Sequence, residues 1–240
     1  MTLPISCPSI DWGSAAQWFA ALATFSAVLV ALFKDEFLRF RRRPKLEPSI
    51  KLASPDCHKT HLNYQLIPTS TFGRTECYYL RLWIENRGKT RAEKVQVFAA
   101  KLSRKNADGS FAIVEDFLPM NLRWAHAETS PNGVEIFADG ISPKMGKHCD
   151  LGHIVNPADR VIVGEDLTTV PTGKTLLALD LEVRPNTMSH LIPPGTYQLE
   201  LRVAGANCSP VKRIIEITLT GEWFDDQNRM FSEGLGIRTL

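Results

Sequence analysis

The chain has 240 residues, of which 44% are hydrophobic and 22% are charged, so it can form one large or two small domains with a buried core. This composition excludes wholesale disorder and fibrous repeats. Hydrophobicity and positive charge are both concentrated near the N-terminus, so their distribution is more informative than their averages.

The first predicted element is a membrane-spanning helix at residues 12–33, a stretch that contains no charged side chain. As a helix that rises about 1.5 Å per residue, these 22 residues span roughly 33 Å, enough to cross a hydrocarbon core of about 30 Å. We expect a short extracytoplasmic segment at residues 1–11 before it. Trp12 and Trp18 are candidate membrane anchors.

A basic segment at residues 34–45 follows and contains six lysines and arginines, whereas the ten residues before Asp11 contain none. The positive-inside rule therefore places the N-terminus outside and the rest of the chain in the cytoplasm. Within this segment, Arg41, Arg42 and Arg43 form a topology signal that also attracts anionic lipid, so the bilayer is an expected partner.

A cleaved signal peptide is the alternative interpretation of the N-terminal region. Ala21, Leu22 and Ala23 have the small-residue form of a cleavage site, which would leave Thr24 as the new N-terminus. These residues lie in the middle of the apolar stretch, and the segment before it carries no positive charge. The membrane-spanning helix is therefore the favoured prediction.

Small side chains recur along the apolar stretch at spacings of three and four residues, which places them on one face of a helix. In lipid, such a face lets two helices approach closely, so it is a candidate seam for self-association. The seam consists of Gly13, Ala16, Ala20, Ala23, Ala27 and Ala31. Gln17 and Thr24 are candidate interhelical hydrogen-bonding residues. The alternative is that alanine is simply common in membrane helices.

The remaining residues, 46–240, are predicted to form one cytoplasmic domain that is nearly neutral. They contain 22 of the 28 basic and 23 of the 26 acidic residues, a net charge of −1. A protein that binds nucleic acid needs a concentrated cationic face, so nucleic acid is excluded as the main partner. The five cysteines are an odd number, and in the cytoplasm they are expected to be reduced.

Alternation of apolar and polar residues predicts short antiparallel strands in this domain, with no amphipathic helices between them. The predicted strands are residues 46–52, 77–86, 94–102, 176–184, 197–203 and 212–219. A short helix is expected near Asp225–Glu233, with Asp225 as its cap. Residues 104–175 alternate only weakly, and we expect mostly loops there, with candidate strands in FAIVEDF, VEIFAD and VIVG. The predicted fold is mainly β, an Ig-like antiparallel sandwich.

Two resemblances accompany this prediction. The segment YLRLWIENRGKTRAEKVQVFAAKL resembles the paired strands of Ig-like sandwich modules, with Asn-x-Gly ending one strand and Ala-x-x-Val beginning the next. The chain as a whole, through FLPMNLRWAH, KHCDLGHI, PPGTYQLELRV and GEWFDD, resembles an uncharacterised family of bacterial proteins with one membrane span. That resemblance implies a place in the bacterial inner membrane and no particular activity.

No catalytic motif is complete. Gly173-Lys174-Thr175 ends like a phosphate-binding loop, but Thr168 occupies the position of the first glycine. Acid–base pairs such as His153 with Asp150, or His126 with Glu128, arise easily by chance. Histidines and cysteines cluster twice and would suit zinc, although the spacing is not that of a known finger. The two clusters are Cys57, His58 and His61, and His148, Cys149 and His153. We expect neither a bound metal nor another cofactor.

Aromatic side chains on the outward face of the predicted strands are the strongest candidates for binding a partner, because aromatic residues and arginine are enriched at protein interfaces. The candidates are Tyr79, Trp83 and Phe98, together with Arg123, Trp124 and His126 from a neighbouring loop. The alternative is that residues 104–175 cover the aromatic face and that the Arg123 loop is structural.

From these features we expect a non-enzymatic interaction module that binds a protein partner at the membrane. The alternative is a membrane effector, of the kind found in antiphage systems, whose helices assemble into homo-oligomers when the domain senses a ligand or partner. A membrane-tethered hydrolase is a more distant alternative.

Overall fold

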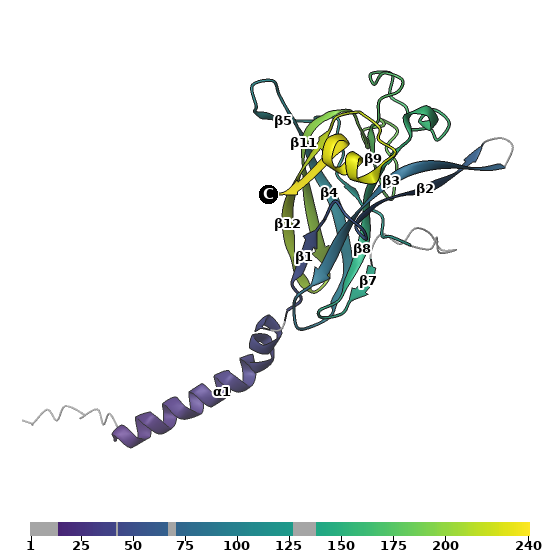
Figure 1. Cartoon of the computed structure of the whole chain (residues 1–240). Helices are drawn as coiled ribbons and strands as arrows, with labels where there is room; N and C mark the ends of the chain where they lie inside the picture. Colours follow the sequence, from purple (N-terminus) through teal and green to yellow (C-terminus); the bar gives the residue numbers. More distant parts are fainter. Residues whose placement is uncertain (1–13, 42, 67–70, 127–137) are drawn as a thin grey trace, which may run out of the picture. The chain divides into compact units, whose positions relative to one another are not determined.

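The computed structural model describes residues 14–41, 43–66, 71–126 and 138–240 (Figure 1). The chain divides into two compact units, Met1–Arg43 and Pro44–Leu240, which are described separately. Trp12, Gly13 and Arg42, which the sequence places in the anchor, the seam and the basic segment, lie outside the described residues.

The first unit contains the helix α1 (Ala15–Arg41). It begins with a reciprocal cap, because Ser14 Oγ accepts from the Gln17 N–H at 3.4 Å and Gln17 Oε1 accepts from the Ser14 N–H at 2.8 Å. The helix extends beyond residue 33 into the basic segment, which contains no glycine or proline before Pro44. In the described part of the chain, Ala15–Lys34 is the helix long and apolar enough to be a membrane span or a signal sequence, with a mean hydropathy of 1.8.

The second unit is a sandwich of two antiparallel sheets, which confirms the predicted β architecture (Figure 1). Among the described residues, sheet 1 has six strands and sheet 2 has seven. In spatial order, sheet 1 consists of β1 (Leu46–Ser49), β3 (Thr71–Asn86), β8 (Gly146–Val155), β9 (Leu177–Leu179) and β10 (Leu191–Ile192), and β2 (Cys57–Leu66) also pairs with β3. Sheet 2 consists of β13 (Leu235–Thr239), β12 (Cys208–Leu219), β11 (Gly195–Gly205), β4 (Ala92–Lys105) and β5 (Phe111–Ile113), and β6 (Met120–Asn121) and β7 (Ala138–Ile141) also pair with β4.

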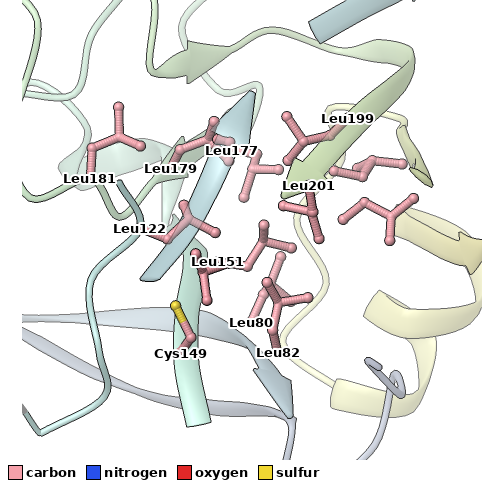
Figure 2. Packing of buried hydrophobic residues seen from close by; sticks show 14 of the residues in the cluster. Leu80, Leu82, Leu122, Cys149, Leu151, Leu177, Leu179, Leu181, Leu199 and Leu201 are labelled. Carbon is pink, nitrogen blue, oxygen red and sulfur yellow. The ribbon is translucent and has the colours of Figure 1, made fainter. Parts of the chain in front are cut away.

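The core lies between the facing sides of the two sheets. The inward residues that alternation predicts on β3, β4, β11 and β12 are buried, and Figure 2 shows leucines of β3, β8 and β9 packed near leucines of β11. The labelled core residues are Leu80, Leu82, Leu122, Cys149, Leu151, Leu177, Leu179, Leu181, Leu199 and Leu201. Burial of these side chains, at about 25 cal/mol per Å² of apolar surface, supplies the main stabilisation of the fold.

Several predicted elements differ from the structure. β9 ends at Leu179, and Val183, which was predicted to face inward, is 65% exposed. The VIVG segment is a turn, in which the Val163 N–H donates to the Asp159 carbonyl at 3.1 Å. FAIVEDF contains β5, whereas VEIFAD lies mostly outside the described residues. The strands β2, β6, β8, β10 and β13 were not predicted.

The short C-terminal helix is present where it was predicted, but it has a different cap. α2 (Gln227–Arg229) continues directly into the π-helix η2 (Met230–Gly234). Asp226 Oδ1, not Asp225, accepts from the Arg229 N–H, at 2.8 Å. Asp225 instead accepts from the Trp223 indole N–H at 2.8 Å.

β3 and β4 are consecutive in the chain but belong to different sheets, so the predicted strand pair does not form. The chain crosses between the sheets at Asn86, which is fully buried. The Asn86 side chain accepts from the N–H groups of Lys45 and Gly88 and donates to the carbonyls of Thr90 and Ile141. The Asn-x-Gly pattern therefore marks a crossing between sheets and not a hairpin within one.

A second crossing closes one side of the sandwich. β6 pairs with β4 in sheet 2, and the chain then joins sheet 1, where Trp124 forms an isolated bridge with Cys149 of β8. The Asp150 N–H donates to the Arg123 carbonyl at 2.8 Å, and the Ala125 N–H donates to the His148 carbonyl at 3.1 Å. The FLPMNLRWAH segment therefore forms backbone hydrogen bonds with strands of both sheets.

Candidate functional site

The candidate site is the outer face of sheet 1, where polar and aromatic side chains form rows across neighbouring strands. Residues directly opposite each other in antiparallel strands share a face. On β3, Leu80, Leu82 and Ile84 face the core, so the alternate residues face outward. The register gives three rows: His58–Tyr79–His153, Arg81–Asp150, and Ser49–Trp83–His148.

The row at Tyr79 is covered by loops. His153 is 1% exposed, and its Nδ1 lies 3.0 Å from Asp180 Oδ1 while its Nε2 lies 2.9 Å from Glu165 Oε1. The Tyr79 ring stacks on the imidazole, with centroids 5.6 Å apart and an interplanar angle of 17°. Asp180 follows β9, and Glu165 lies in the loop before it, so residues distant in the sequence cover this end of the face.

The buried imidazole is held as a cation. Burial opposes the positive charge, but Asp180 and Glu165 outweigh it and raise the pKa of His153 to about 10. Both ring nitrogens are engaged by carboxylates, so the imidazole has no free nitrogen with which to act as a general base or metal ligand. The pair His153–Asp150, named above as one that could arise by chance, does not form; His153 instead pairs with Asp180 and Glu165, and these contacts hold the covering loops on sheet 1.

The middle row is an arrangement of alternating charges. Arg81 Nε donates to Asp150 Oδ1 at 3.1 Å. Burial and the nearby Asp180 raise the pKa of Asp150 to about 6, against the opposing charges of Arg81 and Arg123. Arg123 is exposed, so its guanidinium is available beside this row.

The row at Trp83 is open and borders a pocket of about 600 Å³, which we call the Trp83 pocket. Its lining residues come from β1, β3 and the turn that follows it, β8 and the loop at residues 50–56: Ser49, Lys51, Ala53, Ser54, Pro55, Asp56, Trp83, Glu85, Arg87 and His148. The Trp83 and His148 rings lie 4.7 Å apart. Small-molecule sites occupy roughly 300–1,000 Å³, so this volume suits a ligand or a short peptide segment.

The pocket exists because residues 50–56 interrupt the edge strand of sheet 1. β1 pairs with β3 as far as Trp83, and β2 resumes the pairing at Leu80, so the intervening loop stands opposite only Arg81 and Leu82. Strand irregularities of this kind are frequent beside functional sites.

Asp56 fixes the loop. Its Oδ2 accepts from the Lys51 N–H at 3.0 Å, its Oδ1 lies 3.1 Å from His148 Nε2, and its carbonyl accepts from the Arg81 N–H at 2.9 Å. Asp56 is only 7% exposed, and the pocket wall is therefore preformed.

The structure separates the six predicted partner-binding residues. Tyr79 and Trp83 share the outer face of sheet 1, but Phe98 lies in β4 of sheet 2, so the prediction of one aromatic face containing all three is wrong. Trp124 is 2% exposed and belongs to the core, which makes its ring inaccessible to a partner. Arg123 and His126 are exposed.

The segment 104–175, the alternative expected to cover the aromatic face, does so only in part. Glu165 of that segment and Asp180, which follows it, reach the Tyr79 end of the face. Within the same segment, Leu122 lies in the core and Leu118 is 47% exposed. The sequence also missed Lys51, Ser54 and Asp56. Pro48 in β1 and Pro55 within the loop were the available signal of an interrupted edge strand.

The zinc hypothesis fails on geometry, since the two clusters of histidines and cysteines lie on the strands β2 and β8. Adjacent residues of a strand point to opposite faces, so Cys57 and Cys149 face the core while His58 and His148 face outward. Burial raises the pKa of the Cys57 thiol to about 12, which disfavours the thiolate that zinc requires. Among the described residues, no three His, Cys, Asp or Glu side chains converge on a metal position. Glu128, considered above as an acid–base partner of His126, lies outside those residues.

In the first unit, the described seam residues Ala16, Ala20, Ala23, Ala27 and Ala31 are exposed along α1. The two predicted interhelical hydrogen-bonding residues already have partners within the helix. Gln17 takes part in the cap at Ser14, and Thr24 Oγ1 donates to the Ala20 carbonyl at 2.9 Å. Any association through this face would therefore depend on close packing of alanines.

Comparisons of the chain with protein-family models, curated proteins and solved structures find no match, and no family is identified.

Proposed function

We propose that the chain is a membrane-anchored interaction module, in which the sandwich binds a protein partner through the Trp83 pocket and α1 holds the complex at the membrane. The observation that carries this proposal is the open row at Trp83, beside a pocket whose wall Asp56 fixes. Tryptophan and arginine are enriched at the energetic centres of interfaces, and Trp83 and Arg87 both border this pocket.

The anchor supports the same function. α1 has the length and apolarity for a membrane span, and six basic residues lie within residues 34–45. By the positive-inside rule, this charge distribution supports a cytoplasmic position of the sandwich at a bacterial inner membrane. A module held there increases the local concentration of its partner at the membrane surface.

Photo-crosslinking in intact cells tests the proposal. A photoreactive amino acid replaces Ser54, which is exposed at the pocket, or Thr218, which is exposed in sheet 2. We expect a crosslinked protein partner from position 54 and not from position 218, recovered in the membrane fraction. The same partner from both positions, or no partner from position 54, would contradict the proposal.

A membrane effector is a second candidate, favoured by the exposure of the described alanine seam on α1. Assembly of these helices would perturb the membrane when the sandwich is occupied. Depolarisation of the membrane after co-expression with neighbouring genes distinguishes the two candidates, because the interaction module alone leaves the membrane potential unchanged.

A further inference from the structure

The charged groups that border the Trp83 pocket differ in whether they already have hydrogen-bonding or ion-pair partners. Its carboxylates already have partners: Asp56 Oδ2 accepts from the Lys51 N–H within the loop, Asp56 Oδ1 lies 3.1 Å from His148 Nε2 of β8, and Glu85 accepts from Arg87 Nε at 3.1 Å. In the described part of the chain, by contrast, the Lys51 ammonium forms no ion pair, and the Ser49 and Ser54 hydroxyls form no hydrogen bond. The unused hydrogen-bonding capacity of the pocket is therefore mainly donor capacity.

The excess of free donors over free acceptors indicates which kind of ligand the pocket would bind. A cationic group entering the pocket would meet Lys51 and Arg87 and would have to displace existing partners of Asp56 or Glu85. A carboxylate would form an ion pair with the Lys51 ammonium and accept hydrogen bonds from the two serine hydroxyls, without breaking any of these bonds. The Trp83 indole offers an apolar surface to the carbon atoms that carry the carboxylate.

The following inference rests on the proposed function. We propose that the partner segment bound in the Trp83 pocket is acidic and that Lys51 binds its carboxylate. The pocket volume of about 600 Å³ exceeds what one side chain needs, so it accommodates a short stretch of peptide. Because Asp56 holds the loop in place, the site needs little ordering when the peptide binds.

The test uses the full-length chain in nanodiscs and an array of random synthetic 12-residue peptides. We expect the retained peptides to be enriched in aspartate and glutamate. Lys51→Glu should reduce retention at least tenfold, because the reversed charge repels the carboxylate. The matched control is Lys105→Glu, which makes the same charge change at an exposed lysine of β4 and should leave retention unchanged. Trp83→Leu is a second pocket variant, with its thermal unfolding measured to show that it folds.

Three results would overturn the inference: retained peptides that are neutral or basic, retention that Lys51→Glu leaves unchanged, and Lys51-dependent binding of inorganic phosphate without any selection of peptides. The outcome is separable from that of the proposed function. A partner crosslinked at position 54 whose binding segment is not acidic refutes only the acidic ligand, whereas the absence of any crosslinked partner refutes the interaction module.

Discussion

Asn86 links backbone segments that would otherwise leave buried polar groups without partners. Replacing it with leucine keeps a similar volume but removes all of its side-chain hydrogen bonds, which involve Lys45, Gly88, Thr90 and Ile141. Each buried group left unpaired costs about 1–3 kcal/mol, so Asn86→Leu should lower the free energy of unfolding by at least about 3 kcal/mol.

Urea unfolding of the detergent-solubilised full chain measures this loss. Asn228→Leu is the control, because Asn228 is exposed and the same exchange should change stability by less than about 0.5 kcal/mol. Equal effects of the two substitutions would show that Asn86 does not hold the crossing between the sheets.

His153 should make stability depend on pH in the alkaline range. Its pKa is about 10 in the folded chain against an ordinary value of 6.5, so the folded state binds its proton more tightly than the unfolded state does. The stabilisation is then complete below pH 6.5 and is lost as the pH rises through 10. His153→Gln should lower stability at pH 6 by about 3–5 kcal/mol, because it removes the imidazolium between the buried Glu165 and the largely buried Asp180.

Urea unfolding at pH 6 to 10 checks this prediction, and His61→Gln on an exposed position of β2 is the control. The wild type and the control should lose stability over this range, while His153→Gln should lose much less. A variant whose pH profile parallels that of the wild type would exclude the buried imidazolium.

For single residues, the sequence predicts which side of a strand a side chain faces better than it predicts which other side chains it contacts. Alternation correctly placed Leu80, Leu82 and Ile84 in the core and Trp83 outside it. It could not reveal that Glu165 and Asp180 close on His153, because loops bring these residues together.

Among the elements, β8 shows why a central strand escaped prediction. Its residues from Cys149 to Val155 are all buried, so the alternation between apolar and polar faces is lost. The register with β3 also shifts between Leu80 and Arg81, which breaks the period of two. The edge strand β1 and the pair β11–β12 kept their alternation and were predicted.

β8 also contains a glycine that the packing requires. A Cβ at Gly152 would lie 2.2 Å from the carbonyl oxygen of Ala178, a backbone atom of β9 that cannot move away easily. Gly152→Ala should therefore force β8 and β9 apart and lower the free energy of unfolding by roughly 1–3 kcal/mol.

Gly236→Ala in β13 is the matched control, since the new Cβ would meet Thr218 at an ordinary 3.6 Å. Thermal unfolding followed by circular dichroism compares the two variants. If Gly152→Ala unfolds at the temperature of the control, the close approach of β8 and β9 is not a constraint on the fold.

The α1 seam gives a prediction at the same scale. If alanines mediate self-association, isoleucines at Ala20 and Ala27 should abolish it, because the larger side chains keep the backbones apart. A membrane reporter assay measures the association. Leu29→Ile, outside the seam, is the control and should retain the signal. Association that persists in the doubly substituted helix would leave the seam without a role.

For the whole molecule, the division of charge and hydrophobicity matters more than their averages. The net charge of +2 arises from the N-terminal region, because residues 46–240 carry −1. The sandwich class followed from the spacing of its strands. Its sheet assignments did not, because a turn in the sequence is equally compatible with a hairpin within one sheet and a crossing between two.

The same division predicts how the chain is held in the cell. If α1 remains as an anchor, the full chain should stay in the membrane fraction after alkaline carbonate extraction. Protease added to intact spheroplasts should spare the sandwich, because basic residues follow the span and retain the domain in the cytoplasm. A cleaved signal sequence would instead release a protein that begins near Thr24. N-terminal sequencing decides between the two, since an intact N-terminus together with protease protection is compatible only with the anchored form.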